Sequence, residues 1–564
     1  MHWSESRCRV SDRLAVVVIV SGWAALAAII NPIAEVILND DGAYAYSVKS
    51  VLETGSLKLS PWGGTNLFSQ VYWGALFCLP FGFSYTALRL STLTIALASL
   101  LALYGLMREA GAGSTTALLG VLILALNPLF LVLSFTYMTD VPFLGFTLIA
   151  TYLLVRGVKR QSRIELVLGL LAATAALLTR QTGLALFFAL SLSYLVKNGL
   201  SERNAIKAAA PALLGLGVQF SYQTWLKVTG RMPPTFGKAA MVALDVKSMS
   251  MAHVTRQLVE GVVYALSYLG LFMLPLLLFI GYGRLRDLCR QQRWIALWTS
   301  VILLTECAVL LLHNHRMPLV GNVLYDIGLG PPTVWHYTLP SAGPAFWAAV
   351  TVIGFLTAAL VLQVLISAVL LLVRTRAQHQ ELLLMLLATG VIYFVPLPFV
   401  PVVFDRYYLL FVPLATVILF MTCSLGNAPS RRWAALAVLC LLTYGAFAIA
   451  GTHDYLAWNR VRWQVLRALT VARHIRPEQI DGGYEFNCTY RSPEQKSAAC
   501  DDPLLSFDPT VLYIQILGAH AWWPGYAEAE RYTFRRWLPP GEGTILVLRK
   551  ISSAPSARTA ENLK

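Results

Sequence analysis

Two adjacent carboxylates, in Asn39-Asp40-Asp41-Gly42, stand directly after the first apolar run of the sequence. Adjacent carboxylates at the mouth of a membrane cavity repel one another and lose part of their hydration. Both effects raise the pKa of one of them, which suits a general base. The alternative is helix capping, because Ala43–Leu52 is typical of a helix and Asp is favoured at an N-cap and in a first turn. Taken alone, the residues favour capping.

Two further segments add a carboxylate and a cation. Thr139-Asp140-Val141-Pro142 places Asp140 at the start of another apolar run, where helix capping is again an alternative. Thr179-Arg180-Gln181-Thr182-Gly183 places a lone Arg180 between two apolar runs. An arginine at that depth needs an anionic partner or a route to the lipid interface, and phosphate matches a guanidinium well. Arg180 is therefore a candidate phosphate-binding residue.

A second candidate cation lies in Asp405-Arg406-Tyr407-Tyr408, shortly after Pro396-Leu397-Pro398. Arg406 could bind phosphate beside Arg180. The alternative is an internal Asp405–Arg406 pair within a belt of interfacial aromatic side chains. We expect all of these segments on one face of a membrane, where the chemistry would act on a lipid-linked substrate.

The composition requires membrane helices to position these groups. Of 564 residues, 57% are hydrophobic and 13% are charged, whereas soluble domains carry roughly 25% charge. The mean hydropathy is +0.62. The net charge of +15 lies almost entirely in the first 450 residues, mainly in short links between apolar runs. This placement is typical of cytoplasmic anchors and argues against a nucleic-acid partner.

Thirteen apolar runs approach the roughly 20 residues that cross a bilayer. They predict an all-α multi-pass domain over residues 1–450, with a long first outer loop over 39–84. Alternate links are rich in Lys and Arg and are expected inside, so the N-terminus is predicted to be cytoplasmic and the C-terminal part extracytoplasmic. The runs are 14–34, 84–106, 115–133, 142–158, 164–179, 182–196, 208–226, 259–282, 294–312, 346–373, 381–399, 407–424 and 433–450.

Residues 451–551 change character and predict a small extracytoplasmic α/β domain. Tyr455–Ile475 favours an amphipathic helix, and Val511–Leu517 and Thr544–Leu548 favour strands. Cys488 and Cys500 fall in this part, where a disulfide between them is one of two open alternatives. The polar end, residues 552–564, is expected to be disordered.

These motifs resemble the GT-C membrane glycosyltransferases, in particular family 39 and its relatives, which include protein O-mannosyltransferases and lipid A aminoarabinose transferases. That family has an acidic pair after its first span, similar to Asp40-Asp41 with Tyr44-Ala45. Thr139-Asp140-Val141-Pro142 and the segments around Arg180 and Arg406 also look like family elements. Two departures concern donor binding: Ala43 stands where some relatives have Arg, and Ser69-Gln70-Val71-Tyr72 stands where many have Lys/His-Pro-Pro-Leu.

The resemblance implies an inverting glycosyltransferase of the plasma or inner membrane that uses a polyprenyl-phosphate sugar. Asp40 would be the general base, Asp41 the second member of the catalytic acidic pair, Asp140 an accessory acid near the site, and Arg180 and Arg406 the phosphate-binding residues. The acceptor would be a lipid, a polysaccharide or a protein. A divalent metal ion is an additional source of positive charge, although the sequence identifies no ligands for it. Two alternatives remain: a transporter or lipid flippase, and a non-catalytic relative.

Overall fold

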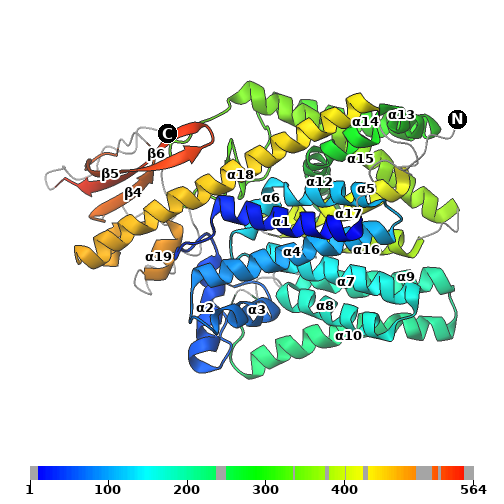
Figure 1. Cartoon of the computed structure of the whole chain (residues 1–564), viewed down its shortest axis with the longest axis horizontal. Coiled ribbons are helices and arrows are strands. Elements are labelled where there is room, and N and C mark those ends of the chain that lie inside the picture. The colour runs from blue at the N-terminus through cyan, green and yellow to red at the C-terminus, as the bar shows by residue number, and fades with distance from the viewer. Residues whose placement is uncertain are drawn as a thin grey trace.

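The computed structural model consists mainly of long helices, with a small sheet near the C-terminus (Figure 1). It describes residues 11–61, 63–234, 236, 249–334, 337–374, 380–400, 402–423, 430–490, 511–518 and 523–551. The predicted disordered tail, 552–564, lies outside these residues. The fold class expected from the sequence, an all-α multi-pass membrane protein with a small C-terminal α/β region, is confirmed.

Nine helical segments in the described part of the chain are long and apolar enough to cross a bilayer. The last of them, α18, is 37 residues long. A segment that crosses lipid must be helical, because lipid offers no hydrogen bonds to its backbone groups, and apolar side chains predominate in all nine. Their helices are α1 (Asp12–Ile30), α4 (Tyr85–Glu109), α7 (Asp140–Arg160), α12 (Met251–Ile280), α14 (Arg293–Leu312), α15 (Pro344–Arg374), α16 (Gln380–Phe394), α17 (Phe411–Cys423) and α18 (Arg431–Arg467).

The bent pair α5 (Ser114–Ala125) and α6 (Pro128–Ser134), whose axes differ by 68°, meets the same length and hydropathy requirement only when its two helices are counted together. The bend has a local cause. Asn127 caps α6 by accepting hydrogen bonds from the N–H groups of Leu129 and Phe130, at 3.0 and 3.2 Å, and Pro128 occupies the first turn.

The thirteen apolar runs, some of which are short, differ in how well their helices meet the requirements for a span. Each of the thirteen apolar runs coincides with a helix, but three of these helices do not meet the length and hydropathy expected of a span. Two of the three are short, since α8 (Arg163–Thr179) has 17 residues and α9 (Leu184–Asn198) has 15. The third, α10 (Glu202–Val228), has charged residues near both ends, and α13 (Tyr282–Gln291) is a short polar helix between spans.

The predicted loop 39–84 contains two helices, α2 (Asp41–Thr54) and α3 (Phe68–Cys78). Both lie at the end of the bundle that carries the C-terminal strands, which we call the sheet end; α1 begins toward the opposite end (Figure 1). A two-stranded ribbon of β1 (Leu324–Tyr325) and β2 (Gly328–Leu329) precedes α15.

Helix α18 joins the bundle to the C-terminal sheet without interruption, and a π-helical turn over Ala468–Ala472 follows it. The predicted boundary at residue 450 falls inside this helix, and the predicted helix Tyr455–Ile475 forms its second half. The sheet has the order β3-β4-β6-β5 and is antiparallel except for the β3–β4 pair. Its elements are β3 (Ile480–Asp481), α19 (Tyr484–Tyr490), β4 (Tyr513–Leu517), β5 (Tyr526–Trp537) and β6 (Pro540–Lys550).

Candidate active site

The two adjacent carboxylates have different environments. Asp40 occupies the N-cap position of α2, but its side chain makes no capping hydrogen bond. It instead lies 3.3 Å from a guanidinium nitrogen of Arg406, and about a quarter of its side chain is exposed (27%). Asp41 is fully buried, and its Oδ1 accepts a hydrogen bond from the N–H of Tyr137 at 2.8 Å. The capping alternative therefore does not describe Asp40.

Burial raises the pKa of Asp41 to about 8, and the nearby Arg89 guanidinium and the Tyr137 N–H only partly oppose this effect. Its Oδ2 has no hydrogen-bond partner among the described residues. The sequence predicted that the pKa of one of the two carboxyl groups would be raised. That group is Asp41, whose neutral form is favoured at pH 7. Asp40 is the member of the pair that is both accessible and ion-paired.

Asp140 and Arg180 form a second pair. Asp140 begins α7, and Arg180 follows the end of α8. A guanidinium nitrogen of Arg180 lies 2.9 Å from Asp140 Oδ1, and its Nε donates to the hydroxyl of Thr139 at 2.7 Å. Both charged side chains are buried. The sequence predicted that an arginine at this depth needs an anion, and Asp140 is that anion.

Arg406 does not pair with the neighbouring carboxylate. Asp405 accepts backbone N–H groups from Val323, from Leu324 at 2.6 Å and from Arg406 itself at 2.7 Å. This buried carboxylate therefore anchors the β1 segment, and the guanidinium of Arg406 remains directed at Asp40. The internal Asp405–Arg406 side-chain pair considered from the sequence is absent from the contacts described here.

Tyr407 connects the two ion pairs. The guanidinium carbons of Arg180 and Arg406 each lie 5.7 Å from the centroid of its ring. Such contacts favour a cation over an aromatic face. The five predicted site residues are thus brought to one place at the sheet end. Asp40–Arg406 and Asp140–Arg180 form two pairs around Tyr407, and Asp41 lies directly beside Asp40 in the chain.

Two residues that lie near Asp41 were not predicted from the sequence. Arg89 in α4 is fully buried, and its guanidinium donates to the carbonyl groups of Ala34 and Val36. An arginine within an otherwise apolar run was the available signal. Gln70, one of the departures from the family pattern, donates to the carbonyl of Tyr137 at 2.8 Å, and the Tyr137 hydroxyl donates to the carbonyl of Gln70. Gln70 therefore supports the backbone that binds Asp41.

Within the described residues, no group of three or more His, Cys, Asp or Glu side chains could hold a metal ion. The positive charge that the structure places in the site comes from the two arginines. Cys488 in α19 is disulfide-bonded, and Cys500 lies outside the described residues.

Residues 71–224 match the model of a protein family described as dolichyl-phosphate-mannose-protein mannosyltransferase. The range includes Asp140 and Arg180. The chain is therefore similar, over this range, to a family of glycosyltransferases, as its motifs predicted. No curated protein sequence matches the chain.

Two solved structures are similar to most of the chain at low identity. One is ArnT from Cupriavidus metallidurans bound to undecaprenyl phosphate, with 12% identity, coverage of 95% of this chain and 98% of that one, and a TM-score of 0.46. The other is the oligosaccharyltransferase from Archaeoglobus fulgidus, with 13% identity, coverage of 78% and 56%, and a TM-score of 0.41. Neither likeness is close enough to carry an argument about activity.

Proposed function

We propose that this protein is a membrane glycosyltransferase that moves a sugar from a polyprenyl-phosphate donor to an acceptor hydroxyl, with Asp40 as the general base. The observation that carries the proposal is the gathering of Asp40, Asp140, Arg180 and Arg406 around Tyr407. The family match over residues 71–224 supports it, because the description of that family names a polyprenyl-phosphate-linked sugar as donor.

The reaction is a single displacement. The acceptor oxygen attacks the anomeric carbon from the face opposite the phosphate, its proton passes to a carboxylate oxygen of Asp40, and the bond between that carbon and the phosphate oxygen breaks. The configuration at the anomeric carbon is inverted. Negative charge then develops on the leaving polyprenyl phosphate, where Arg406 and Arg180 would stabilise it.

The pairing of the arginines fits this role. Each guanidinium already has one carboxylate partner, and an incoming phosphate would share it. The raised pKa of Asp41 keeps that carboxyl group neutral, so it adds no negative charge beside the leaving phosphate. Asp140 would act as an accessory acid that holds Arg180 in place.

An apolar groove offers a place for the polyprenyl chain. It has a volume of about 280 Å³ between α12, α15, α16 and α17, and Phe411 and Phe394 are among its lining residues. Phe411 contacts Tyr393, with ring centroids 5.6 Å apart, and the Tyr393 hydroxyl donates to the carbonyl of Tyr407 at 3.0 Å. Tyr393 therefore links a residue that lines the groove to the backbone of Tyr407, and an isoprenoid chain bound in the groove would have its phosphate on the Tyr407 side.

The distribution of cations supports a site on the outer face of the plasma or inner membrane. The end of the bundle away from the site carries Arg108, paired with Asp12, and both Lys159 and Arg160, which share Glu109, so that cations outnumber carboxylates in these pairs. An excess of Lys and Arg marks cytoplasmic ends. We therefore place the N-terminus in the cytoplasm and residues 451–551 outside, where flipped lipid-linked sugars are available. The acceptor remains open between a lipid, a polysaccharide and a protein.

The test is sugar transfer in membranes supplied with a panel of radiolabelled polyprenyl-phosphate sugars, wild type beside Asp40→Asn. We expect label to reach an acceptor with the wild type only, and the product to have the opposite anomeric configuration to the donor. Equal transfer by Asp40→Asn at equal expression would remove Asp40 as the base. No transfer with any donor would favour a transporter, although the described residues contain one bent helix pair rather than a matching two.

A further inference from the structure

The segment that joins α1 to α2 is an extended connector, Asn31–Asn39, with no helix or strand of its own. It ends at Asp40. Buried backbone groups must find hydrogen-bond partners, and an extended segment outside a sheet cannot obtain them from neighbouring strands. Side chains from distant helices supply these partners, and they do so in a regular pattern.

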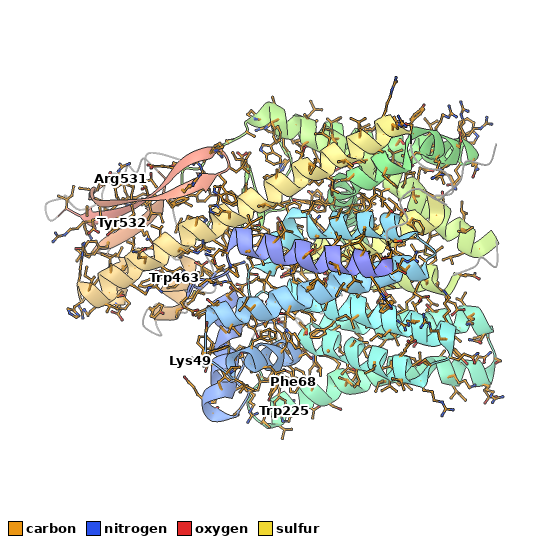
Figure 2. All side chains as sticks on the ribbon, in the orientation of Figure 1. Lys49, Phe68, Trp225, Trp463, Arg531 and Tyr532 are labelled. Carbon is orange, nitrogen blue, oxygen red and sulfur yellow. The ribbon has the colours of Figure 1, made fainter. Side chains whose placement is uncertain are left out.

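Alternate carbonyl groups of the connector are bound from α18. Arg460 donates to the carbonyls of Asn31 and Ile33, Arg467 donates to that of Glu35 at 2.9 Å, and the indole N–H of Trp463 donates to that of Ile37 at 2.9 Å. Successive carbonyls of an extended chain point to opposite sides, so one helix can reach every second one. Figure 2 shows Trp463 on the part of α18 that projects toward the sheet end.

The intervening carbonyls are bound from the other side. Those of Ala34 and Val36 accept from the buried guanidinium of Arg89 in α4. The connector is therefore held between two helices that are far apart in sequence.

The last residue of the connector is held by α19. Asn39 has a φ of 50°, a left-handed conformation that Asn adopts more readily than most residues. Its N–H donates to Glu485 Oε1 at 2.8 Å across 446 positions of sequence. The same Oε1 accepts the hydroxyl of Thr333 at 2.6 Å, and Oε2 lies 2.8 Å from the guanidinium of Arg462. Glu485 and Arg462 are almost completely buried.

We propose that α18 and α19 position the general base, with Trp463 and Glu485 as positioning residues that fix the connector so that Asp40 faces Arg406. This inference rests on the proposed function. It assigns a role to the C-terminal region: α18 and α19 set the geometry of the acid pair, in addition to any contact with an acceptor.

The test compares Trp463→Phe and Glu485→Gln with the wild type. Phenylalanine keeps an aromatic ring but has no N–H for the carbonyl of Ile37. Glutamine has one acceptor oxygen, which cannot serve both Asn39 and Arg462. The matched control is Glu530→Gln, the same chemical change in a carboxylate that pairs with Arg473 in the C-terminal region, away from the connector.

Two readouts are needed. Hydrogen exchange measured by mass spectrometry reports on peptides that cover residues 31–44. We expect exchange in these peptides to be about tenfold faster in both variants and unchanged in the control. Transfer kinetics report on Asp40: kcat should fall about tenfold or more per folded molecule, while KM for the donor changes less than twofold. Faster exchange with unchanged kcat would overturn the positioning role, and so would unchanged exchange.

A double variant distinguishes this inference from the proposed function. If Glu485 acts through Asp40, Asp40→Asn with Glu485→Gln should transfer sugar at the rate of Asp40→Asn alone. A transfer rate in the double variant that is lower than that of Asp40→Asn alone would overturn the claim that Glu485 acts through Asp40. Wild-type transfer by Asp40→Asn would remove the base and with it this inference, whereas the exchange result would still report whether α18 and α19 hold the connector.

Discussion

The two ends of the helix bundle carry the same kinds of charged residues in very different settings. At the sheet end, Arg180 and Arg406 have side chains that are 11% and 5% exposed, and each pairs with an aspartate from another element. At the opposite end, Arg108 pairs with Asp12 and Lys159 pairs with Glu109, and both cations are more than a third exposed. The kind of charged residue therefore does not distinguish the two ends, whereas the burial of these paired charges does.

The difference has an energetic meaning. Exposed ion pairs contribute about 0–1 kcal/mol because water and salt screen them. A buried pair costs much to desolvate, so it adds little net stability, but removing one partner leaves a buried charge without compensation. The sheet end should therefore respond strongly to single substitutions that the opposite end tolerates.

The largest expected effect is on catalysis. Asp40→Asn removes the proton acceptor and should lower kcat by about 10²–10⁴-fold. Asp12→Asn makes the same change in the pair with Arg108 and should leave kcat within about twofold, because Asp12 lies at the opposite end. Initial rates with a saturating polyprenyl-phosphate sugar, normalised to folded protein, measure both. Similar losses in the two variants would contradict the assignment of the site to the sheet end.

The next effect is on stability. Arg180→Ala leaves Asp140 buried without its cation and should cost about 3–5 kcal/mol of the free energy of unfolding. Arg108→Ala, the exposed counterpart, should cost about 0–1 kcal/mol. Thermal unfolding in detergent compares the two variants side by side. The comparison between the ends fails if Arg108→Ala proves to be the more damaging change.

The pH dependence of stability tests the difference between Asp41 and Asp40 within the acid pair. The pKa of Asp41 is about 8 in the folded protein and about 4 in an unfolded chain. Between these values the folded state binds a proton that the unfolded state has released, so the free energy of unfolding falls as pH rises. Asp41→Asn keeps an oxygen for the N–H of Tyr137 and should remove this part of the decline. The measurement is Tm between about pH 5 and pH 8 for the wild type and for Asp41→Asn. An equally steep fall of Tm with pH in both proteins would contradict the expectation.

The smallest expected effect concerns Tyr407. Tyr407→Leu removes the aromatic face between Arg180 and Arg406 but keeps both ion pairs. Cation–π contacts contribute about 0.5–2 kcal/mol, so transfer should fall by roughly tenfold with little change in Tm. Tyr407→Phe retains the ring and should recover most of the rate. Loss of activity in the phenylalanine variant would point to the hydroxyl group instead of the ring.

The sequence predicted much of this architecture because membrane helices leave a strong local pattern. Each apolar run coincides with a helix, and the strands expected over Val511–Leu517 and Thr544–Leu548 fall on β4 and β6. The pattern is least decisive at α8 and α9, which are apolar but have 17 and 15 residues, fewer than the roughly 20 that cross a bilayer. Hydropathy reports composition and does not measure how much of a run becomes helical.

The sequence predicted which residues belong to the candidate site, but it did not predict which of them form ion pairs with one another. Asp40, Asp140, Arg180 and Arg406 stood out as charged residues beside apolar runs. Their partners depend on contacts between distant segments, which no local pattern encodes. Asp405 illustrates this limit, because the guanidinium of its neighbour Arg406 was the obvious partner, whereas its carboxylate accepts the backbone N–H groups of Val323, Leu324 and Arg406. Their roles in transfer stay a prediction until the variants are measured.

The continuous helix α18 also has a consequence for the order in which the site can form during synthesis. The connector leaves the ribosome soon after α1, but its partners Trp463 and Glu485 follow more than 400 residues later, since Asn39 and Glu485 are 446 positions apart. Until then the groups that α18 and α19 bind, which are the carbonyls of Asn31, Ile33, Glu35 and Ile37 and the N–H of Asn39, must be satisfied by water or by temporary contacts. A nascent chain would thus remain without an aligned acid pair until its last helices were inserted. Such a sequence of events would delay chemistry on membrane lipids until assembly is finished.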